Sequence, residues 1–230
     1  MKIIRFFSKK EYNGLGQPLP AKRFLPEWYK ESELTFIPKD GEEEIAGLKK
    51  CVPFLDSMIS GYMLTTPVDI FISKNKDESL NIKWNSSEHF SDFIAERDKE
   101  LGEKIPRPAG HYPNHLSFRG FWGFRTPKGW SILVAQPLNR FDLPWTITSG
   151  FMDSDEFSTS GNIPFFVRED FVGMVPAGTP FAQLIPIKRE SWKSIHNDQG
   201  IVYFDSLQGA TVRTPGKSYK KLFWHRKDYS

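Results

Sequence analysis

Two short turns of the form Pro-x-Gly constrain the fold of this chain most strongly. They are Pro127-Lys-Gly129 and Pro176-Ala-Gly178, and each leads into an apolar run rich in β-branched or aromatic residues. Proline and glycine are turn residues, and an apolar run that is bounded by turn signals is typical of a β-strand. We therefore expect residues 126–192 to form short strands around an acidic loop, Asp153-Ser-Asp-Glu156, and we take this as the unit that organises the chain.

The rest of the sequence extends this β pattern on both sides. The clearest hairpin is predicted at residues 68–72 and 80–84, where apolar and polar residues alternate across a polar turn. Further strands are expected at residues 2–7, 116–124, 130–136, 145–151, 163–167, 181–187 and 201–204. The fold class that follows is mainly β with a few peripheral helices (α+β), built on an antiparallel barrel-like or sandwich body.

Helices are predicted at four places. Residues 52–60 carry apolar side chains on one face, and a longer amphipathic helix is expected from Ser86 or Ser87 to Leu101. A short helix should open at Pro26-Glu27, and Tyr219–Lys227 suggests a closing helix. We expect one domain: an N-terminal arm and helix (1–60), a hairpin plus amphipathic helix (61–110), a β body (111–210) and a basic tail (211–230).

Composition excludes several classes of protein. Apolar residues make up 39% of the 230 and aromatic residues 15%, which argues against disorder. The net charge of +3 is close to balance, so the bulk charge does not indicate a dedicated nucleic-acid-binding protein. No apolar window is long enough for a membrane span, and the start of the chain does not resemble a signal peptide. The single cysteine, Cys51, excludes an internal disulfide, and we expect it to be a buried thiol.

The acidic loop is the first candidate for chemistry. In an extended segment Asp153 and Asp155 would point the same way, share a cation or orient a water, and one of them could serve as a general base. The alternative is that Asp-Ser-Asp is ordinary turn composition. His111 and His115 are four residues apart, but Pro113 between them disfavours the helix that a metal site would need.

Two aromatic stretches have alternative interpretations. Residues 118–124 interleave arginine with aromatic residues and either stack on bases or sugars or, as we favour, form core strands. The N-terminal arm carries a cluster of aromatic and apolar side chains, which either pack on this chain or dock another subunit and so mediate self-association: Phe24, Leu25, Trp28 and Tyr29. The remaining histidines, His89, His196 and His225, are expected at the surface.

Two of these motifs resemble those of trimeric dUTP pyrophosphatases. Residues 150–155 are similar to the motif that holds that family's catalytic aspartate, and residues 177–185 to its Gly-Asp-x-Ile-Ala-Gln-Leu motif. The resemblance implies a β-clip fold that usually trimerises. It also implies that Asp153 activates the water that attacks the α-phosphate, that magnesium is held by the phosphates, and that Gln183 is the glutamine of the later motif.

The sequence departs from that family at several motifs. Glu156-Phe157 stands where the family has a tyrosine against the sugar, and residues 137–140, ending in Arg140, are only a loose substitute for its phosphate-binding motif. The glycine-rich C-terminal motif is absent. From the motifs that match, fully or loosely, the resemblance implies Asp153 as the catalytic candidate and Asp155, Gln183 and Arg140 as the ligand-binding candidates. It implies no metal bound by the protein itself.

The whole chain also resembles a phage-borne family of unknown function. The resemblance lies in residues 20–29, 126–130, 137–140 and 188–192. It implies a location in the host cytoplasm or in the virion. Together these features favour a non-catalytic β-rich protein, either a virion or assembly component or a small-ligand binder. The alternatives are a magnesium-dependent pyrophosphatase acting on deoxynucleoside triphosphates, and a protein that sequesters nucleotides without turnover.

Overall fold

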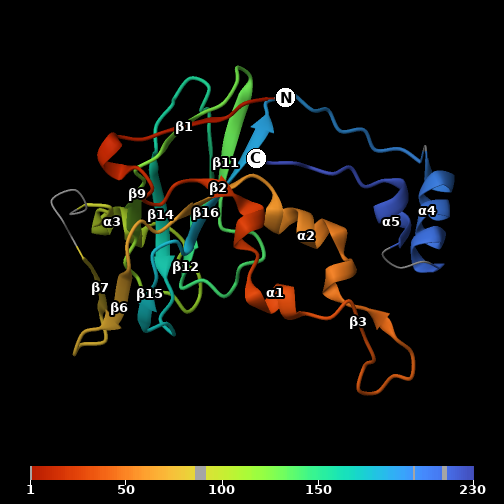
Figure 1. Ribbon diagram of the computed structural model, residues 1–230, viewed down its shortest axis with the longest axis horizontal. Helices are drawn as coiled ribbons and strands as arrows, with labels where there is room; N and C mark the ends of the chain where they lie inside the picture. Colours follow the sequence, from red (N-terminus) through yellow and green to blue (C-terminus); the bar gives the residue numbers. More distant parts are fainter. Residues whose placement is uncertain (1, 86–91, 199, 214–216) are drawn as a thin grey trace.

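The computed structural model describes residues 2–85, 92–198, 200–213 and 217–230 (Figure 1). Every strand pair in this part of the chain is antiparallel, and the strand orders are open, so the described strands close no barrel. The predicted class, mainly β with peripheral helices, is confirmed.

The largest sheet has five strands and contains both runs that follow the Pro-x-Gly turns. Its order is β13 (Gly150–Met152), β11 (Trp130–Ala135), β16 (Pro180–Lys188), β5 (Tyr62–Thr65) and β2 (Leu19–Pro20). Strands β11 and β16 pair along six residues, from Trp130 opposite Lys188 to Ala135 opposite Gln183.

Smaller sheets complete the described strands. The four-stranded sheet has the order β12 (Trp145–Ile147), β14 (Asn162–Val167), β9 (Leu116–Arg119) and β8 (Ile94–Glu96). The three-stranded sheet has the order β15 (Gly173–Val175), β6 (Ile70–Lys74) and β7 (Leu80–Trp84). Two pairs remain, β1 (Arg5–Phe7) with β10 (Gly123–Arg125), and β3 (Thr35–Phe36) with β4 (Ile45–Ala46).

The helices lie around the sheets or away from them (Figure 1). The α-helices are α1 (Glu27–Glu31), α2 (Val52–Ile59), α3 (Lys99–Glu103), α4 (Ile201–Arg213) and α5 (Lys217–Leu222), and the short 3₁₀ turns are η1 (Lys10–Tyr12), η2 (Ala21–Phe24) and η3 (Leu48–Lys50). Within the described ranges, none of these helices has the length and apolar character to cross a bilayer. Helices α1 and α2 and the hairpin β6–β7 match their predictions.

Both Pro-x-Gly turns form as predicted. The N–H of Trp130 donates to the carbonyl of Pro127 over 3.1 Å, and the N–H of Thr179 donates to the carbonyl of Pro176 over 3.2 Å. Gly129 and Gly178 have φ angles of +81° and +84°, a backbone region that side chains with a Cβ atom disfavour. The glycines therefore allow the chain to reverse directly before β11 and before β16.

The hydrophobic core lies between the sheets. Phe181 of β16 stacks on Phe118 of β9 with ring centroids 4.1 Å apart, and it also meets Trp145 and Phe165 at 5.2 Å. Trp122 and Phe124 are buried as well, so the aromatic run at residues 118–124 forms core, as we favoured. Aromatic contacts thus join the five-stranded sheet to the four-stranded sheet.

The long helix predicted up to Leu101 is wrong where the structure describes it. Residues 86–91 lie outside the described part, residues 94–96 form strand β8, and only residues 99–103 are helical. The reason is tertiary: β8 pairs with β9, and Phe93 beside it is buried against Trp84 and Phe118. Pairing and burial outweigh a modest local helix preference.

The strand predicted at residues 201–204 is also wrong, because these residues begin α4. Among the described residues, the last strand is β16, which ends at Lys188. An isolated strand leaves its backbone polar groups without partners, whereas a helix pairs them internally. Since α4 stands away from every sheet in Figure 1, the helix is the conformation that satisfies its backbone.

Three smaller predictions need correction. The single strand expected at residues 145–151 is divided into β12 and β13, which belong to different sheets. The closing helix expected at residues 219–227 ends at Leu222, and the chain then runs back to the body without regular structure. Cys51 is exposed rather than buried.

The N-terminal arm packs against its own chain. Tyr29 is buried and stacks on Phe54 of α2 with centroids 6.1 Å apart, and Trp28 meets the same ring at 6.3 Å. Of the two alternatives for this arm, packing on its own chain is therefore observed. Self-association through this arm stays a prediction.

Candidate functional site

The acidic loop after β13 is a turn rather than an extended segment. The N–H groups of Glu156 and Phe157 both donate to the carbonyl of Asp153, over 3.1 and 2.8 Å. The two carboxylates nevertheless meet, because both contact the guanidinium of Arg189, which follows β16. The side chain of Asp153 is 64% exposed and that of Asp155 only 3%.

Asp155 is held by a bidentate ion pair. Arg189 donates from Nη1 to Oδ1 over 2.8 Å and from Nη2 to Oδ2 over 2.6 Å, and the N–H of Gly129 donates to Oδ2 over 2.8 Å. Hydrogen bonding from Arg189 holds the pKa of Asp155 far below its usual range, and the pKa of Arg189 is raised for the same reason. This cluster ties the turn before β11, the acidic loop and the end of β16 together.

Asp153 belongs to the same cluster. Its Oδ1 atom accepts a hydrogen bond from the buried Oγ of Ser131 over 2.6 Å and lies 3.2 Å from Nη1 of Arg189. The predicted base therefore has one carboxylate oxygen engaged by the protein itself. Its catalytic role stays a prediction.

Gln183 lies in the interior, with 0% of its surface exposed. Its Oε1 accepts from the N–H of Leu138 over 2.9 Å, and its Nε2 donates to the carbonyls of Ser57 and Ser60 over 2.8 and 2.7 Å. The amide thus joins β16 to the end of α2 and to the loop after β11. In this structure its polar atoms face protein, and its ligand-binding role stays a prediction.

Asp153 and Gln183 are not brought together within one chain. Asp153 bonds Ser131, which pairs with Ile187, whereas Gln183 pairs with Ala135. Four residues along a strand span about 13 Å. The two predicted site residues therefore lie toward opposite ends of β11.

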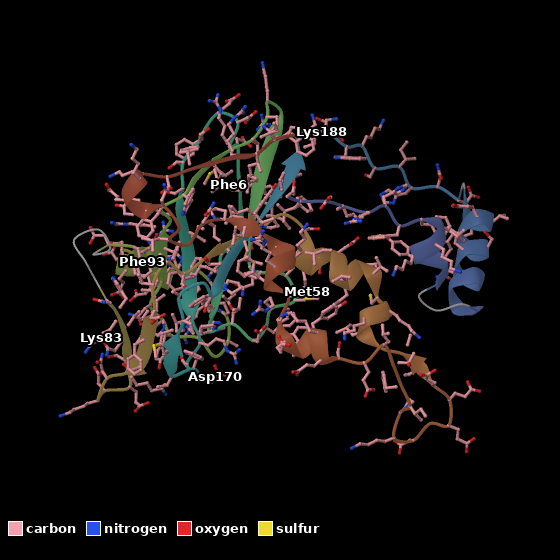
Figure 2. All side chains as sticks on the ribbon, in the orientation of Figure 1. Phe6, Met58, Lys83, Phe93, Asp170 and Lys188 are labelled. Carbon is pink, nitrogen blue, oxygen red and sulfur yellow. The ribbon has the colours of Figure 1, made fainter. Side chains whose placement is uncertain are left out.

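Arg140 is placed beside a cavity of about 580 Å³. The cavity opens where the loop after β11, strand β12 and the segment after β14 meet. Its apolar lining includes Phe141, Leu143 and Trp145, and its polar side chains are His111, Gln136, Arg140, Thr146, Arg168, Glu169 and Asp170. Asp170 is labelled near the lower end of the body in Figure 2.

Two Arg-x-Asp segments form the walls of this cavity, which we call the Arg–Asp cavity. Arg140 donates from Nη2 to Oδ2 of Asp142 over 2.8 Å and from Nη1 to the carbonyl of Phe24 over 3.0 Å. Arg168 donates from Nε to Oδ1 of Asp170 over 2.9 Å and from Nη2 to Oδ2 over 2.5 Å. Each arginine is thereby fixed by the carboxylate two residues further along the chain.

These pairs also set the charge of the cavity. The hydrogen bond from Arg168 lowers the pKa of Asp170. Burial alone would raise the pKa of Asp142, but the hydrogen bonds and charge of Arg140 prevail and the net pKa is lowered. Both carboxylates are therefore ionised at neutral pH, and the lining holds two arginines against Glu169 and Asp170.

His111 and Gln136 complete a fixed polar surface. The Nε2 atom of His111 is 2.9 Å from the hydroxyl of Thr146, and its Nδ1 atom is 2.9 Å from the carbonyl of Ala109. Gln136 accepts from the N–H of Ile147 over 2.8 Å. Because these side chains already have partners, they are oriented before any ligand arrives.

Among the residues of this cavity, the sequence analysis predicted only Arg140 as a ligand-binding residue, and it considered His111 only as a metal ligand. The feature of the sequence that could have indicated the remaining polar residues is the repeated Arg-x-Asp spacing, at residues 140–142 and 168–170. The two histidines of the His111–His115 segment do not meet in a metal site, since the described residues contain no group of three His, Cys, Asp or Glu side chains placed to hold a metal ion.

Comparisons with known proteins place this chain in no family. No protein-family model, no curated protein and no solved structure matches it.

Proposed function

We propose that this protein is a non-catalytic β-rich binder of a small, uncharged, ring-bearing molecule such as a nucleoside or a sugar. The Arg–Asp cavity is the binding site. The observation that carries the proposal is a polar lining whose charges are paired and whose side chains are held by protein partners.

The size of the cavity fits this class of ligand. Sites for small molecules usually measure about 300–1,000 Å³ and combine apolar walls with a few well-placed polar groups. A volume of about 580 Å³ with Leu143 and Trp145 behind the polar side chains falls within that range. The cavity thus holds a molecule of one or two rings.

One aromatic side chain of this cavity is available to contact a ligand. Phe141 lines it and is 82% exposed, so its ring face is free to stack on a flat or ring-shaped ligand. The paired arginines lower the attraction for a phosphate, because each positive charge already faces a carboxylate. An uncharged ligand therefore suits the site better than a triphosphate.

Calorimetry with a panel of nucleosides, nucleoside triphosphates, monosaccharides and disaccharides tests the proposal. We expect binding of at least one uncharged member, and a loss of about 5- to 150-fold in affinity for Phe141→Ala, because stacking on an aromatic ring contributes about 1–3 kcal/mol. Phe157→Ala is the matched control, since Phe157 is exposed and lies outside this cavity. Absence of binding across the panel, or equal losses in both variants, contradicts the proposal.

The same panel tests the two alternative functions that follow from the resemblance to dUTP pyrophosphatases. Magnesium-dependent hydrolysis of a triphosphate that is lost in Asp153→Asn supports the pyrophosphatase, and with it the β-clip classification of the body. Tight triphosphate binding without turnover supports nucleotide sequestration. The ion pairs of Asp153 and Asp155 with Arg189 favour the non-catalytic proposal, because they give this loop a structural use.

A further inference from the structure

Helices α4 and α5 form a unit that stands apart from the β body. Figure 1 shows them joined to the body by two long connections, and Figure 2 shows their side chains separated from those that crowd the sheets. Residues 190–198 of the first connection are exposed and have no regular structure. We call residues 192–198, 200–213 and 217–227 the helical unit.

Large apolar side chains of this unit face solvent. Trp192 is 88% exposed and Val202 is 80% exposed, and the other members of the set are Ile195, Ile201, Tyr203, Phe204, Tyr219, Leu222 and Phe223. A single chain thus leaves uncovered a number of apolar groups that a soluble monomer normally buries.

Residues 33–48 contain the hairpin of β3 and β4 and the start of η3, and we call them the acidic hairpin. They carry a second exposed apolar set on the same side of the molecule (Figure 1): Leu34, Phe36, Ile37, Ile45 and Leu48. This hairpin and the helical unit together hold 14 of the 23 exposed large apolar side chains in the part of the chain that the structure describes. Exposure of apolar surface is therefore concentrated in these two regions rather than scattered.

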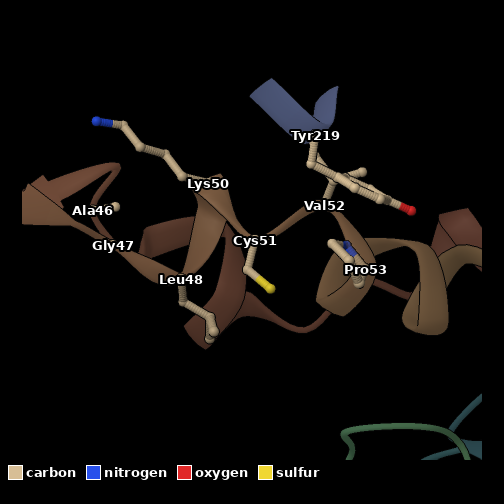
Figure 3. Close-up of a pocket in the computed structure, with 8 residues that line it drawn as sticks. All are labelled: Ala46, Gly47, Leu48, Lys50, Cys51, Val52, Pro53 and Tyr219. Atoms are coloured by element: carbon tan, nitrogen blue, oxygen red, sulfur yellow. The ribbon is translucent and has the colours of Figure 1, made fainter. Parts of the chain in front are cut away.

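A gap separates the two regions. Tyr219 of α5 lies beside Val52 and Pro53 at an open, largely apolar cavity of about 560 Å³ (Figure 3). The rest of its lining comes from Ala46, Gly47, Leu48, Lys50 and Cys51. One chain by itself brings the walls together without filling the space between them.

The two regions carry opposite charge. Residues 33–44 contain five acidic residues and one lysine, whereas residues 217–228 contain five basic residues and one aspartate. No ion pair among the described residues joins these two segments. Lys227 is paired with Asp56, whereas Lys220 and Lys221 are exposed, as are Glu42 and Glu43 of the acidic segment.

We propose that a second copy of this chain occupies this surface. Under a two-fold axis the acidic hairpin of each copy meets the basic helical unit of the other, so one surface satisfies both charges twice. A uniformly acidic or uniformly basic partner would be repelled by one of the two halves. A copy of the same chain is complementary to both.

The available surface is large enough for such a dimer. A stable interface of standard size uses roughly 20–30 residues from each partner, with an apolar centre and a charged rim. Residues 33–48, 192–198, 200–209 and 219–227 exceed that number, and they combine exposed apolar side chains with charges of both signs. The inference does not depend on the Arg–Asp cavity or on its ligand.

The helical unit is tethered rather than free. Trp224 donates from Nε1 to Oδ2 of Asp56 over 2.9 Å, and Nζ of Lys227 lies 2.5 Å from the same oxygen. Asp56 belongs to α2, whose first residues line the cavity beside Tyr219. This contact fixes one end of the unit against the body next to the surface proposed for docking.

Sedimentation velocity of the full chain, from about 1 µM to about 500 µM, tests the proposal, because interfaces with micromolar constants dissociate in that range. We expect a concentration-dependent dimer that weakens at high salt, since exposed charges are screened. Phe204→Ser should shift the equilibrium toward monomer at least 10-fold, while Phe157→Ser, an equally exposed phenylalanine on the body, should leave it unchanged.

Charge reversal provides a second test that does not depend on apolar surface. Lys220→Glu with Lys221→Glu and Arg226→Glu gives one variant, in which the net charge of residues 217–228 changes from +4 to −2. Glu42→Lys with Glu43→Lys and Glu44→Lys gives the other, in which the net charge of residues 33–44 changes from −4 to +2. Each variant alone should be monomeric, because like charges then face each other in both contacts. Mixed together they should form a heterodimer, because both contacts regain opposite charges.

A wild-type chain that stays monomeric up to about 500 µM overturns the proposal. So does a dimer that survives in both charge-reversed variants, since its interface would then lie elsewhere, for example at the N-terminal arm. Failure of the mixture to restore a dimer has the same consequence. Far-ultraviolet circular dichroism of each variant confirms that it is folded before its mass is interpreted.

Discussion

The β body and the helical unit differ in how far they bury their apolar side chains. In the body, side chains from separate sheets meet across one core, as Phe181 does with Phe118. In the helical unit, Val202 and its apolar neighbours remain exposed within one chain. The body therefore has an internal source of stability, whereas the unit satisfies its backbone locally and leaves its side chains to a partner.

This difference extends to polar groups. The body places Gln183 where each of its polar atoms bonds to main chain, and it uses Arg189 to hold two carboxylates. The described part of the helical unit is tethered to the body through Asp56, which accepts from Trp224 and pairs with Lys227. Substitutions in the body should therefore change stability, and those in the unit should change association.

The largest effect is expected in the core. Phe181→Ala removes a buried ring that contacts three aromatic side chains, and such truncations cost about 3–5 kcal/mol. Urea unfolding at low protein concentration measures the loss. If Phe204→Ala in α4 costs as much under the same conditions, the distinction between body and unit is wrong.

The second largest loss of stability is expected when the buried hydrogen bonds of Gln183 are removed. Gln183→Ala leaves the N–H of Leu138 and the carbonyls of Ser57 and Ser60 without this partner, and at about 1 kcal/mol for each bond the expected loss is about 3 kcal/mol. The matched control is Gln208→Ala, an exposed glutamine in α4, which should change unfolding by less than about 0.5 kcal/mol. Equal losses would contradict the structural role of Gln183.

A pH effect should follow from Asp155. Its pKa is lower in the folded chain than in the unfolded chain, so the stability that it contributes is present above the unfolded value of about 3.9 and is lost as the pH falls. Asp155→Asn should be less stable than wild type at pH 7 and should lose less stability on acidification. Denaturant unfolding at several pH values compares them, and parallel curves would exclude this contribution.

The smallest effect on stability is expected in the helical unit. Phe204→Ala should change the unfolding free energy by less than about 0.5 kcal/mol at low concentration, because its ring already faces solvent. At high concentration the wild type should gain stability from association, and the variant should gain less. Thermal unfolding at two protein concentrations measures both, and a variant that gains as much as the wild type would argue against a docking role for this ring.

The candidate site was only partly predictable. Asp153, Asp155, Gln183 and Arg140 are all prominent in the sequence, but their partners are distant: Arg189 is 34 residues from Asp155, and Ser57 is 126 residues from Gln183. The Arg–Asp cavity was missed because its walls come from three separate segments. Only pairing of the sheets brings these segments together.

Local sequence was sufficient to predict the two Pro-x-Gly turns and the alternation of apolar and polar residues along the strands. Pro127-Lys-Gly129 and Pro176-Ala-Gly178 restrict the local backbone, and the alternation in residues 68–72 follows from the two-residue period of a strand. These are local constraints, so they act before any distant contact forms. They were enough to predict the hairpin and the antiparallel character of the body.

Tertiary structure decided the cases in which local preference was weak or misleading. Residues 94–96 became strand β8 because β9 offered hydrogen bonds and a core, whereas the β-branched run at residue 201 became helix α4 because no sheet edge lay beside it. The physical reason is the same for both. A backbone must pair its polar groups, and whether a neighbouring strand is present to pair them is a property of the whole fold.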